Sequence, residues 1–440
     1  MEITVIGAGL AGCEAAYAAA QRGVKVRLIE MKPLKKTPAH KSDGFAELVC
    51  SNSLKAERVA SAAGLLKREM QYFGSLTVEC AYECRVPAGG ALAVDRDAFS
   101  ALVTKRIKEH PLIECVSEEC CDIPSGVTII ATGPLTSEPL AQKIKELCSE
   151  EFLNFYDAAA PIVTAESVDM SSAFAASRYE RGGEDDYINC PMNKEEYEHF
   201  YSELVAAQSA ELHSFDIRKD VYEGCMPIEA LAKRGADTMR FGPMKPVGLR
   251  DPRTGHRPWA VVQLRKENAE GLLYNLVGFQ TNLKFSEQKR VFSLIPALRN
   301  AEFVRYGVMH RNMFINSPRL LDSDFSFRNR KGLFFAGQIT GVEGYMESAM
   351  SGLLAGINAV NYLNGEKSIE LPRFTMCGAL TAYISDETVT SFQPMGANFG
   401  VLPPLGEHIR DKKLRYEALA QRSVDYFENL KRGEINEDNR

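Results

Sequence analysis

Cys225 lies just before a predicted helix, in a stretch of the chain that is rich in basic residues. Pro227 suits the first position of a helix, where its missing N–H costs nothing, and Ile228 to Ala232 follow as a short helical pattern. The thiol would then face unpaired N–H groups and the positive end of a helix dipole. This setting favours the thiolate, which is the nucleophilic form. Most free cysteines are buried as small hydrophobic residues, so the segment alone leaves both interpretations open.

A second cysteine, Cys50, stands in a similar context. Ser51, Asn52 and Ser53 follow it and are good N-caps, so a helix that carries the apolar residues from Leu54 to Phe73 is predicted to begin there. Two thiols at helix N-termini suggest either a dithiol redox pair or a nucleophile with its base. The other nine cysteines fall mostly in helix or strand patterns and are interpreted as structural.

His310 is a third candidate, within the run from Gly307 to Asn312. Its imidazole could stack on a planar ligand or simply bond to the backbone. Local sequence alone favours the backbone interpretation.

The elements that must position these side chains begin at the N-terminus. A strand at residues 2–6, a glycine-rich turn, a helix at 14–20 and a second strand at 24–29 form a βαβ unit. In such a unit the first glycine permits the turn, the second lets the backbone approach a diphosphate, and the third allows close helix–strand packing. An acidic residue at the end of the second strand accepts hydrogen bonds from the adenosine ribose. The predicted dinucleotide-binding residues are therefore Gly7, Ala8, Gly9, Leu10, Ala11, Gly12 and Glu30.

Two later strands favour FAD over a nicotinamide cofactor in this fold. Residues 127–133 and 332–337 each read as a buried strand that ends in glycine, and the second runs into a helix of small residues. Both patterns resemble those of the large flavoproteins with two dinucleotide folds, which adds Gly337, Gly341 and Gly344 to the cofactor site. The fold class is α/β, with a discontinuous Rossmann-like FAD-binding domain and an inserted α+β domain.

The predicted boundaries follow from these strands. Residues 1–155 form the first part of the FAD-binding domain, 156–299 form the insertion that carries Cys225, and 300–440 form the second part and a C-terminal helix. Strands are predicted at 259–264 and 272–277, and a rigid loop at 241–252. No second glycine-rich dinucleotide motif is visible, so NADH or NADPH is expected to bind without a fold of its own.

Composition narrows the class of protein further. The chain has 440 residues, of which 45% are hydrophobic and 25% charged, as in ordinary globular proteins. No apolar run approaches the ~20 residues that span a bilayer. The 11 cysteines lack the spacing of zinc sites and of a disulfide framework. We expect a reduced, cytoplasmic protein without a structural metal.

Charge is unevenly distributed although the net charge is only −6. Residues 146–200 carry 13 acidic and 3 basic side chains, whereas residues 218–266 carry 11 basic and 5 acidic ones. Local potential steers a polyanion, yet charge alone slightly favours two solvated faces of opposite sign. The basic residues of the second stretch include Lys233, Arg234, Arg240, Lys245, Arg250 and Arg253, and further basic side chains lie between residues 284 and 311.

Taken together, the segments resemble the folate- and FAD-dependent tRNA (uracil-5-)-methyltransferase family over nearly the whole chain. The resemblance rests on the opening glycine motif, the two cysteine segments and three further runs, at residues 278–283, 307–312 and 337–344. The flavin motifs are shared with the related tRNA wobble-uridine modification flavoproteins. Those relatives normally have a much longer helical C-terminal region, which this sequence lacks.

The resemblance implies a mechanism. FAD, reduced by NADH or NADPH, would carry a methylene group from 5,10-methylenetetrahydrofolate to carbon 5 of the T-loop uridine of tRNA and then supply hydride. Cys225 would add to carbon 6 of the uracil, and Cys50 would remove the proton from carbon 5 or protect the methylene carrier. His310 would stack on the pterin ring of the folate, against the expectation from local sequence. The basic side chains would contact phosphates of the tRNA.

Three alternatives remain open at this point. The same chemistry could act on ribosomal RNA, since only the RNA-contacting surface would differ. Cys50 and Cys225 could instead form the redox pair of a flavin-dependent NAD(P)H oxidoreductase, although this leaves the basic insertion unexplained. A non-catalytic RNA-binding flavoprotein would not explain two activated thiols. No membrane association and no obligate protein partner are expected.

Overall fold

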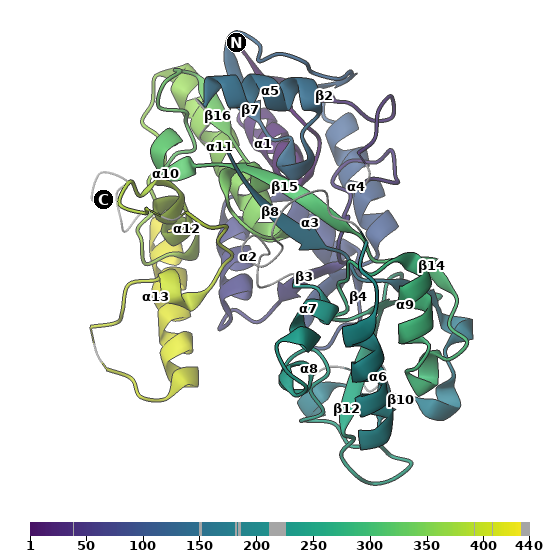
Figure 1. Ribbon diagram of the computed structural model, residues 1–440. Helices are drawn as coiled ribbons and strands as arrows, with labels where there is room; N and C mark the ends of the chain where they lie inside the picture. Colours follow the sequence, from purple (N-terminus) through teal and green to yellow (C-terminus); the bar gives the residue numbers. More distant parts are fainter. Residues whose placement is uncertain are drawn as a thin grey trace.

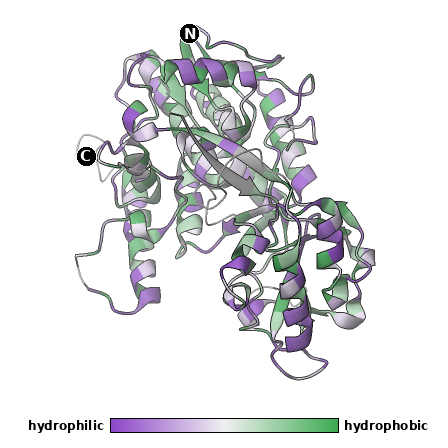
Figure 2. Ribbon diagram, in the orientation of Figure 1, coloured by the Kyte–Doolittle hydropathy of each residue, from purple (hydrophilic) through white to green (hydrophobic). Residues whose placement is uncertain are grey.

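The computed structural model describes residues 1–37, 39–148, 152–180, 183, 186–210, 226–390, 392–406 and 408–432, with only the backbone of 152–157, 180, 310 and 311. Its two larger sheets lie in two lobes, here called the upper and lower lobes as they appear in Figure 1. Hydrophobic residues follow the strands inside both lobes, and hydrophilic ones prevail on the outer turns (Figure 2). Among the described helices, none is long and apolar enough to cross a membrane.

The upper lobe is built on a parallel sheet with the strand order β16-β7-β1-β2-β6. Its strands are β1 (Glu2–Ile6), β2 (Lys25–Glu30), β6 (Ile113–Ser117), β7 (Val127–Ile130) and β16 (Leu333–Phe335). β16 pairs with β7 although some 200 residues separate them in the sequence. This pairing confirms the predicted α/β class and its discontinuous Rossmann-like sheet.

Helices cover both faces of this parallel sheet. They are α1 (Leu10–Gln21), α11 (Tyr345–Asn364), α4 (Arg96–Lys108) and α5 (Glu138–Leu147). Because side chains alternate along a strand, Val5 and Ile129 join the core with α1 and α11, whereas Ile6 and Ile130 join the core with α5. Both faces are therefore buried, as is usual for a parallel sheet.

The predicted small-residue helix is confirmed as α11, and it packs directly on α1. A Cβ atom at Gly352 would lie 2.0 Å from the carbonyl oxygen of Ala11, and one at Gly356 would lie 2.6 Å from that of Ala15. Only glycine permits the two backbones to approach so closely. The first and last thirds of the chain thus meet across two helices.

The upper lobe contains further helices, and three of them meet at a buried carboxylate. They are α2 (Ala62–Tyr72), α3 (Leu76–Glu83), α10 (Ser317–Leu320), α12 (Met376–Ser385) and α13 (Lys412–Arg432). The predicted C-terminal helix is α13. Glu69 of α2 accepts hydrogen bonds from the N–H groups of Met376 and Cys377 and from the Ser423 hydroxyl. These bonds join α2, α12 and α13.

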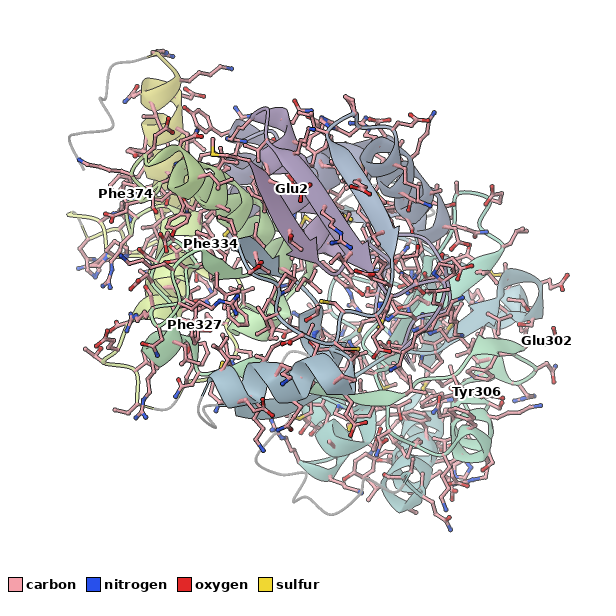
Figure 3. All side chains as sticks on the ribbon, turned by 90° about the horizontal axis from the view of Figure 1, so that it is seen from above. Glu2, Glu302, Tyr306, Phe327, Phe334 and Phe374 are labelled. Carbon is pink, nitrogen blue, oxygen red and sulfur yellow. The ribbon has the colours of Figure 1, made fainter. Side chains whose placement is uncertain are left out.

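The lower lobe contains a six-stranded sheet with the order β10-β11-β12-β13-β9-β14. Its strands are β9 (Ile162–Thr164), β10 (Phe174–Ala175), β11 (Tyr187–Met192), β12 (Ala260–Lys266), β13 (Leu273–Leu276) and β14 (Phe303–Arg305). Its helices are α6 (Lys194–Ala206), α7 (Ile228–Lys233), α8 (Thr238–Phe241) and α9 (Phe285–Phe292). The two predicted paired strands are confirmed as antiparallel β12 and β13. Seen from above, Tyr306 at this lobe lies far from Phe374 beside α12 (Figure 3).

A two-stranded ribbon of β8 (Phe152–Ala158) and β15 (Met309–Ile315) runs between the lobes (Figure 1). The strands of the lower sheet all lie between Ile162 and Arg305. The predicted domain boundary near residue 155 falls on β8, whereas the one near residue 300 falls before β14 of the lower sheet; both remain predictions.

The helix predicted to start after Cys50 is wrong in its first half. Ser53–Ala56 form strand β3, which pairs with β5 (Ala91–Val94) in a small sheet with β4 (Arg85–Val86). Lys55 has a φ of 64°, which a right-handed helix excludes. Helix α2 begins only after Ser61, whose hydroxyl accepts a hydrogen bond from the Gly64 N–H. Cys50 therefore does not lie at a helix N-terminus.

Lys67 of α2 should make stability rise with pH. Its ammonium is buried and donates to the carbonyls of Leu54 and Ala63, and burial lowers its pKa to about 8, from 10.5. Between these values the unfolded chain holds a proton that the folded chain has lost, so the free energy of unfolding increases with pH, by at most about 1.4 kcal/mol per pH unit. Urea denaturation from about pH 7 to about pH 10 should show this increase in the wild type. In Lys67→Met the free energy of unfolding should increase less over the same pH range, because the contribution of Lys67 is missing. Lys105→Met, on the exposed face of α4, is the control.

Candidate active site

The turn between β1 and α1 opens onto a cavity at the carboxyl ends of the parallel strands. Residues from β1 and β2, from the segment that follows β7 and from the start of α11 line it together. The predicted residues in its lining are Gly7, Ala8, Gly9, Leu10, Ala11, Glu30 and Gly337. Ligands of open parallel sheets bind at this edge.

Glycines of the opening turn fit a dinucleotide diphosphate. A Cβ atom at Gly12 would lie 1.7 Å from the carbonyl oxygen of Gly7, so this glycine serves helix–strand packing. A Cβ atom at Gly9 would meet no atom within 4 Å, so the chain leaves open space there. The first N–H groups of α1 have no side-chain cap and face that space.

Glu30 fits the ribose end of the same ligand. Its two carboxylate oxygens accept hydrogen bonds from the N–H groups of Ala8 (2.7 Å) and Lys32 (2.9 Å). These bonds fix the carboxylate at the end of β2, where it lines the cavity. The remaining lone pairs can accept from ribose hydroxyls.

The three later glycines play different parts. Gly337 lines the nucleotide cavity, and Gly344 lines a neighbouring one. Gly341 lines neither cavity; a Cβ atom there would lie 2.4 Å from the ring of Phe392. All three have positive φ angles, from 80° to 123°, which glycine adopts without strain.

A group of buried polar residues also lines the nucleotide cavity and was missed from the sequence. The Thr37 hydroxyl lies 2.6 Å from Nδ1 of His40, and the pKa of His40 is lowered by burial and next by Lys32. Glu47 lies 3.7 Å from the Lys32 ammonium, and its Oε2 has no hydrogen-bond partner among the described residues. The segment has no regular pattern that could have predicted these contacts.

Cys50 lies in the lining of the second cavity, which adjoins the first. The two cavities share Val49, Pro134, Leu135, Gln338, Tyr345 and Ser348. The Cys50 thiol donates a long hydrogen bond, 3.6 Å, to the carbonyl of Ala158 on β8. The thiol thus lies where the upper lobe, the ribbon and the nucleotide cavity meet.

Tyr345, at the start of α11, fixes the backbone of Cys50. Its phenol oxygen accepts hydrogen bonds from the N–H groups of Cys50 (2.7 Å) and Ser51 (3.1 Å). Burial raises the pKa of Tyr345, and Cys50 raises it further, so the phenol stays neutral. Local sequence patterns could not predict this contact, because 295 residues separate the partners.

Cys225 lies outside the described residues, but the chain just after it is described. The short helix predicted there is confirmed as α7, with one correction: Pro227, at ψ 141°, is the N-cap rather than the first helical residue. Because α7 has only six residues, its dipole is weaker than that of the helix expected from the sequence. The Ile228 N–H donates to the carbonyl of Gln280, 2.7 Å away, and Gln280 lines the Cys50 cavity.

The contact of α7 with residues 280–282 is reinforced by a buried carboxylate. Glu229 accepts hydrogen bonds from the Thr281 hydroxyl (2.8 Å) and the Asn282 N–H (2.8 Å). Burial raises the pKa of Glu229, although these bonds oppose the shift. The start of α7 is therefore held firmly beside the cavity.

His310 is described by its backbone alone. It lies on β15, paired with Asp157 of β8. Asn312, two residues further on the same strand, is buried and lines the Cys50 cavity. Stacking of the imidazole on a ligand remains a prediction.

The six candidate RNA contacts differ in their surroundings. Arg240 pairs with Asp237, and its guanidinium lies 3.7 Å from the centre of the Trp259 ring. Arg253 pairs with Asp251 and donates to the carbonyl of Ser171. Both support the local fold and are less available to a phosphate than predicted. Lys233, Arg234 and Arg250 are exposed, and Lys245 is half-buried.

Comparison with known proteins identifies the group to which this arrangement belongs. Residues 2–367 match the family model described as glucose inhibited division protein A. The methylenetetrahydrofolate–tRNA-(uracil-5-)-methyltransferase TrmFO of Brevibacillus brevis is 58% identical over 97% of this chain and 98% of its own. The protein of the same name from Acetivibrio thermocellus is 58% identical over 96% of this chain and 97% of its own.

Among solved structures, Aquifex aeolicus GidA resembles this fold with a TM-score of 0.70. The match covers 99% of this chain and 74% of that one, at 17% sequence identity. At this identity the likeness concerns the fold alone.

Proposed function

The chain belongs to the glucose inhibited division protein A family and, within it, to the methylenetetrahydrofolate–tRNA-(uracil-5-)-methyltransferases, and on this premise we propose what it does. It is a folate- and FAD-dependent enzyme that methylates carbon 5 of a uridine in tRNA, and the target uridine is that of the T loop. 5,10-Methylenetetrahydrofolate gives the carbon, and NADH or NADPH gives the electrons.

One observation carries the proposal beyond the family name. The nucleotide cavity and the Cys50 cavity share six lining residues, and the residue that α7 contacts, Gln280, lines the latter. A planar group that extends from the nucleotide cavity would therefore reach Cys50. The chain that follows Cys225 contacts the wall of this cavity, through the hydrogen bond from the Ile228 N–H to the carbonyl of Gln280. Nothing in a plain nicotinamide dehydrogenase would need this junction.

FAD is the group that the first cavity would hold. Gly9 and the start of α1 would bind its diphosphate, and Glu30 would bind its adenosine ribose. When bound, FAD supplies a carrier for the methylene carbon and the hydride that completes the methyl group.

The two cysteines have separate tasks. The Cys225 thiolate adds to carbon 6 of the uracil, and the electron pair of the 5,6 double bond moves toward the oxygen on carbon 4. Carbon 5 becomes nucleophilic and accepts the one-carbon unit. Cys50 then accepts the proton that leaves carbon 5, and expulsion of the Cys225 sulfur restores the ring. His310 stacks on the pterin of the folate.

The division of labour follows the predicted domains. Residues 1–155 and 300–440 hold FAD and Cys50, and the insertion at 156–299 holds Cys225 and the RNA. The target uridine must leave its stack to reach Cys50, at a cost of a few kcal/mol. Exposed cations on the lower lobe would offset this cost by contacting phosphates, which position the RNA without reading its sequence.

Reversing two exposed charges should weaken RNA binding. In the double variant Lys233→Glu/Arg250→Glu, we expect a higher dissociation constant for tRNA and a salt dependence that is shallower by about 1 for each lost phosphate contact. Binding titrations at several salt concentrations measure both quantities. Lys367→Glu, exposed after α11 on the upper lobe, is the control. If the affinity and its salt dependence are unchanged, α7 and the 242–259 loop do not form the RNA-binding surface.

Nucleoside mass spectrometry tests the function as a whole. Purified holoenzyme is incubated with an unmodified tRNA transcript, methylenetetrahydrofolate and NADH, and 5-methyluridine is expected at the T-loop position. Methylation of a ribosomal RNA fragment alone would point to the other RNA substrate. Oxidation of NADH with a disulfide substrate and no methylation of either RNA would point to the dithiol oxidoreductase.

A further inference from the structure

Three arginines converge on the short segment that carries Cys50. Arg96 of α4 donates to the carbonyl of Leu48, and Arg305 of β14 donates to the carbonyl of Val49. Arg265 of β12 donates to the Ser51 hydroxyl (2.9 Å). Two of the three come from the sheet of the lower lobe, so both lobes determine where Cys50 lies.

Of these three arginines, Arg96 alone forms an ion pair with a carboxylate among the described residues, whereas Arg265 donates to the neutral side chains of Asn52 and Ser51. Arg96 forms a buried ion pair with Glu267, at 2.9 Å. Burial is the largest influence on the pKa of Arg96 and would lower it, but Glu267, Tyr345 and Cys50 together raise it. Arg305 is half-buried, and no carboxylate of the described residues lies within ion-pair distance of it. Burial lowers the pKa of Arg305, Arg96 lowers it further, and Tyr345 and Cys50 act in the opposite direction.

Among the described residues, cations outnumber acids around the backbone of the Cys50 segment. The cations are Arg96, Arg265, Arg305 and Lys41, and the pKa of Lys41 is lowered by burial and next by Arg305 and Arg96. The acids are Glu267, which Arg96 neutralises, and Glu47, which faces Lys32 and Lys41. In the cavity itself Glu347 pairs with Lys55 at 2.6 Å, and the buried carboxylate of Glu343 accepts a hydrogen bond from the Gln338 amide. A buried cation without an anion is costly, and an anion at Cys50 would reduce that cost.

We propose that Arg305, with Arg96 beside it, is a positioning residue that holds Cys50 as a thiolate at neutral pH. The thiol gives its proton to solvent, and the guanidinium remains protonated throughout. The hydrogen bond from Arg305 to the carbonyl of Val49 fixes the backbone one residue before the sulfur, so the favourable charge and the correct orientation come from the same side chain. This inference rests on the proposed role of Cys50 as the base for carbon 5, because a base must be deprotonated before it acts.

Arg305→Met tests the proposal, because methionine keeps much of the length of the side chain and removes its charge. The rate at which iodoacetamide alkylates Cys50 in the flavin-loaded enzyme, without RNA or folate, is followed against pH by mass spectrometry of the Cys50 peptide. We expect the apparent pKa of Cys50 to rise by about one unit, and the rate at neutral pH to fall about tenfold. Arg305→Lys should restore most of the rate. Arg257→Met, an exposed arginine of the lower lobe, is the matched control.

If bound flavin shields Cys50 from the reagent, the ultraviolet absorbance of the thiolate gives the same quantity. Each protein is titrated against its own Cys50→Ala partner, so the other cysteines cancel. An identical apparent pKa of Cys50 in wild type and Arg305→Met, with flavin and melting temperature retained, would overturn the proposal. These measurements need no RNA, so their outcome is independent of whether the methylation assay succeeds.

Turnover provides a second readout that a purely structural role would not give. In Arg305→Met the acid limb of the kcat–pH profile should move to higher pH, KM for tRNA should stay the same, and activity should recover at alkaline pH. Activity lost equally at every pH would instead show that Arg305 serves only the fold.

Discussion

Replacing Cys225 with alanine should reduce methyl transfer by at least about 1000-fold, the scale on which loss of a covalent nucleophile lowers turnover. Uracil carbon 5 reacts poorly until a nucleophile has added at carbon 6. The proposed nucleophile is the Cys225 sulfur, and we expect no other side chain to replace it at that position. FAD should remain bound, because its cavity is lined by residues of the upper lobe alone. Single-turnover formation of 5-methyluridine, with the flavin spectrum recorded on the same sample, measures both effects.

A transcript with 5-fluorouridine at the target separates the two cysteines. Fluorine at carbon 5 cannot leave as a proton, so the adduct with carbon 6 should persist as a covalent protein–RNA complex. Cys225→Ala should lose this complex, whereas Cys50→Ala should retain it while methylating slowly. Cys190→Ala, at a buried cysteine of β11 in the same lobe, should behave as wild type. Normal methylation by Cys225→Ala would remove it as the nucleophile.

Gly9→Ala should separate flavin binding from folding. Gly9 has a φ of −72°, which alanine adopts easily, and its added Cβ would meet no protein atom within 4 Å. That space is where the diphosphate of FAD would lie, so we expect the dissociation constant for FAD to rise about 100-fold, or about 2.8 kcal/mol. The apoprotein should lose only about 1 kcal/mol, the usual difference between glycine and alanine at an N-cap.

Gly12→Ala is the informative contrast, because its Cβ would lie 1.7 Å from a backbone oxygen. This variant should unfold at a much lower temperature whether or not FAD is present. Gly90→Ala, in open space on the turn before β5, is the control for a harmless added methyl group. Flavin titrations and melting curves of the apoproteins give the comparison. Unchanged FAD affinity in Gly9→Ala would mean that the diphosphate lies elsewhere.

Local patterns predicted the parts of the fold that local forces determine. The strand–turn–helix–strand from residue 2 to residue 30 is confirmed because periodicity, glycine spacing and the terminal acid all agree. The strands at 127–130 and 333–335 are likewise confirmed, since buried parallel strands read as continuous apolar runs. The family, and with it the activity, was predicted from six motifs taken together. None of these motifs alone would have identified the family.

Contacts between distant segments were beyond the reach of the sequence. Serines and an asparagine after Cys50 resemble N-caps, but pairing of β3 with β5 outweighs that local preference. Asn52 instead donates to the carbonyls of Val94 and Lys266. The arginines around Cys50 come from α4, β12 and β14, which are far apart in the sequence. Their convergence depends on how the lobes pack, which no local pattern records.

The late position of β16 and α11 has a consequence for the synthesis of this protein. A nascent chain makes β1, α1, β2 and β7 early, but β7 keeps an open edge until β16 arrives at residue 333. The nucleotide cavity also lacks Gly337, Gln338, Tyr345 and Ser348 until then. FAD can therefore be captured only after residue 348 of 440 has left the ribosome. Before that point the unpaired edge of β7 can associate with other chains. Binding of FAD therefore indicates that the last strand of the sheet has been added correctly.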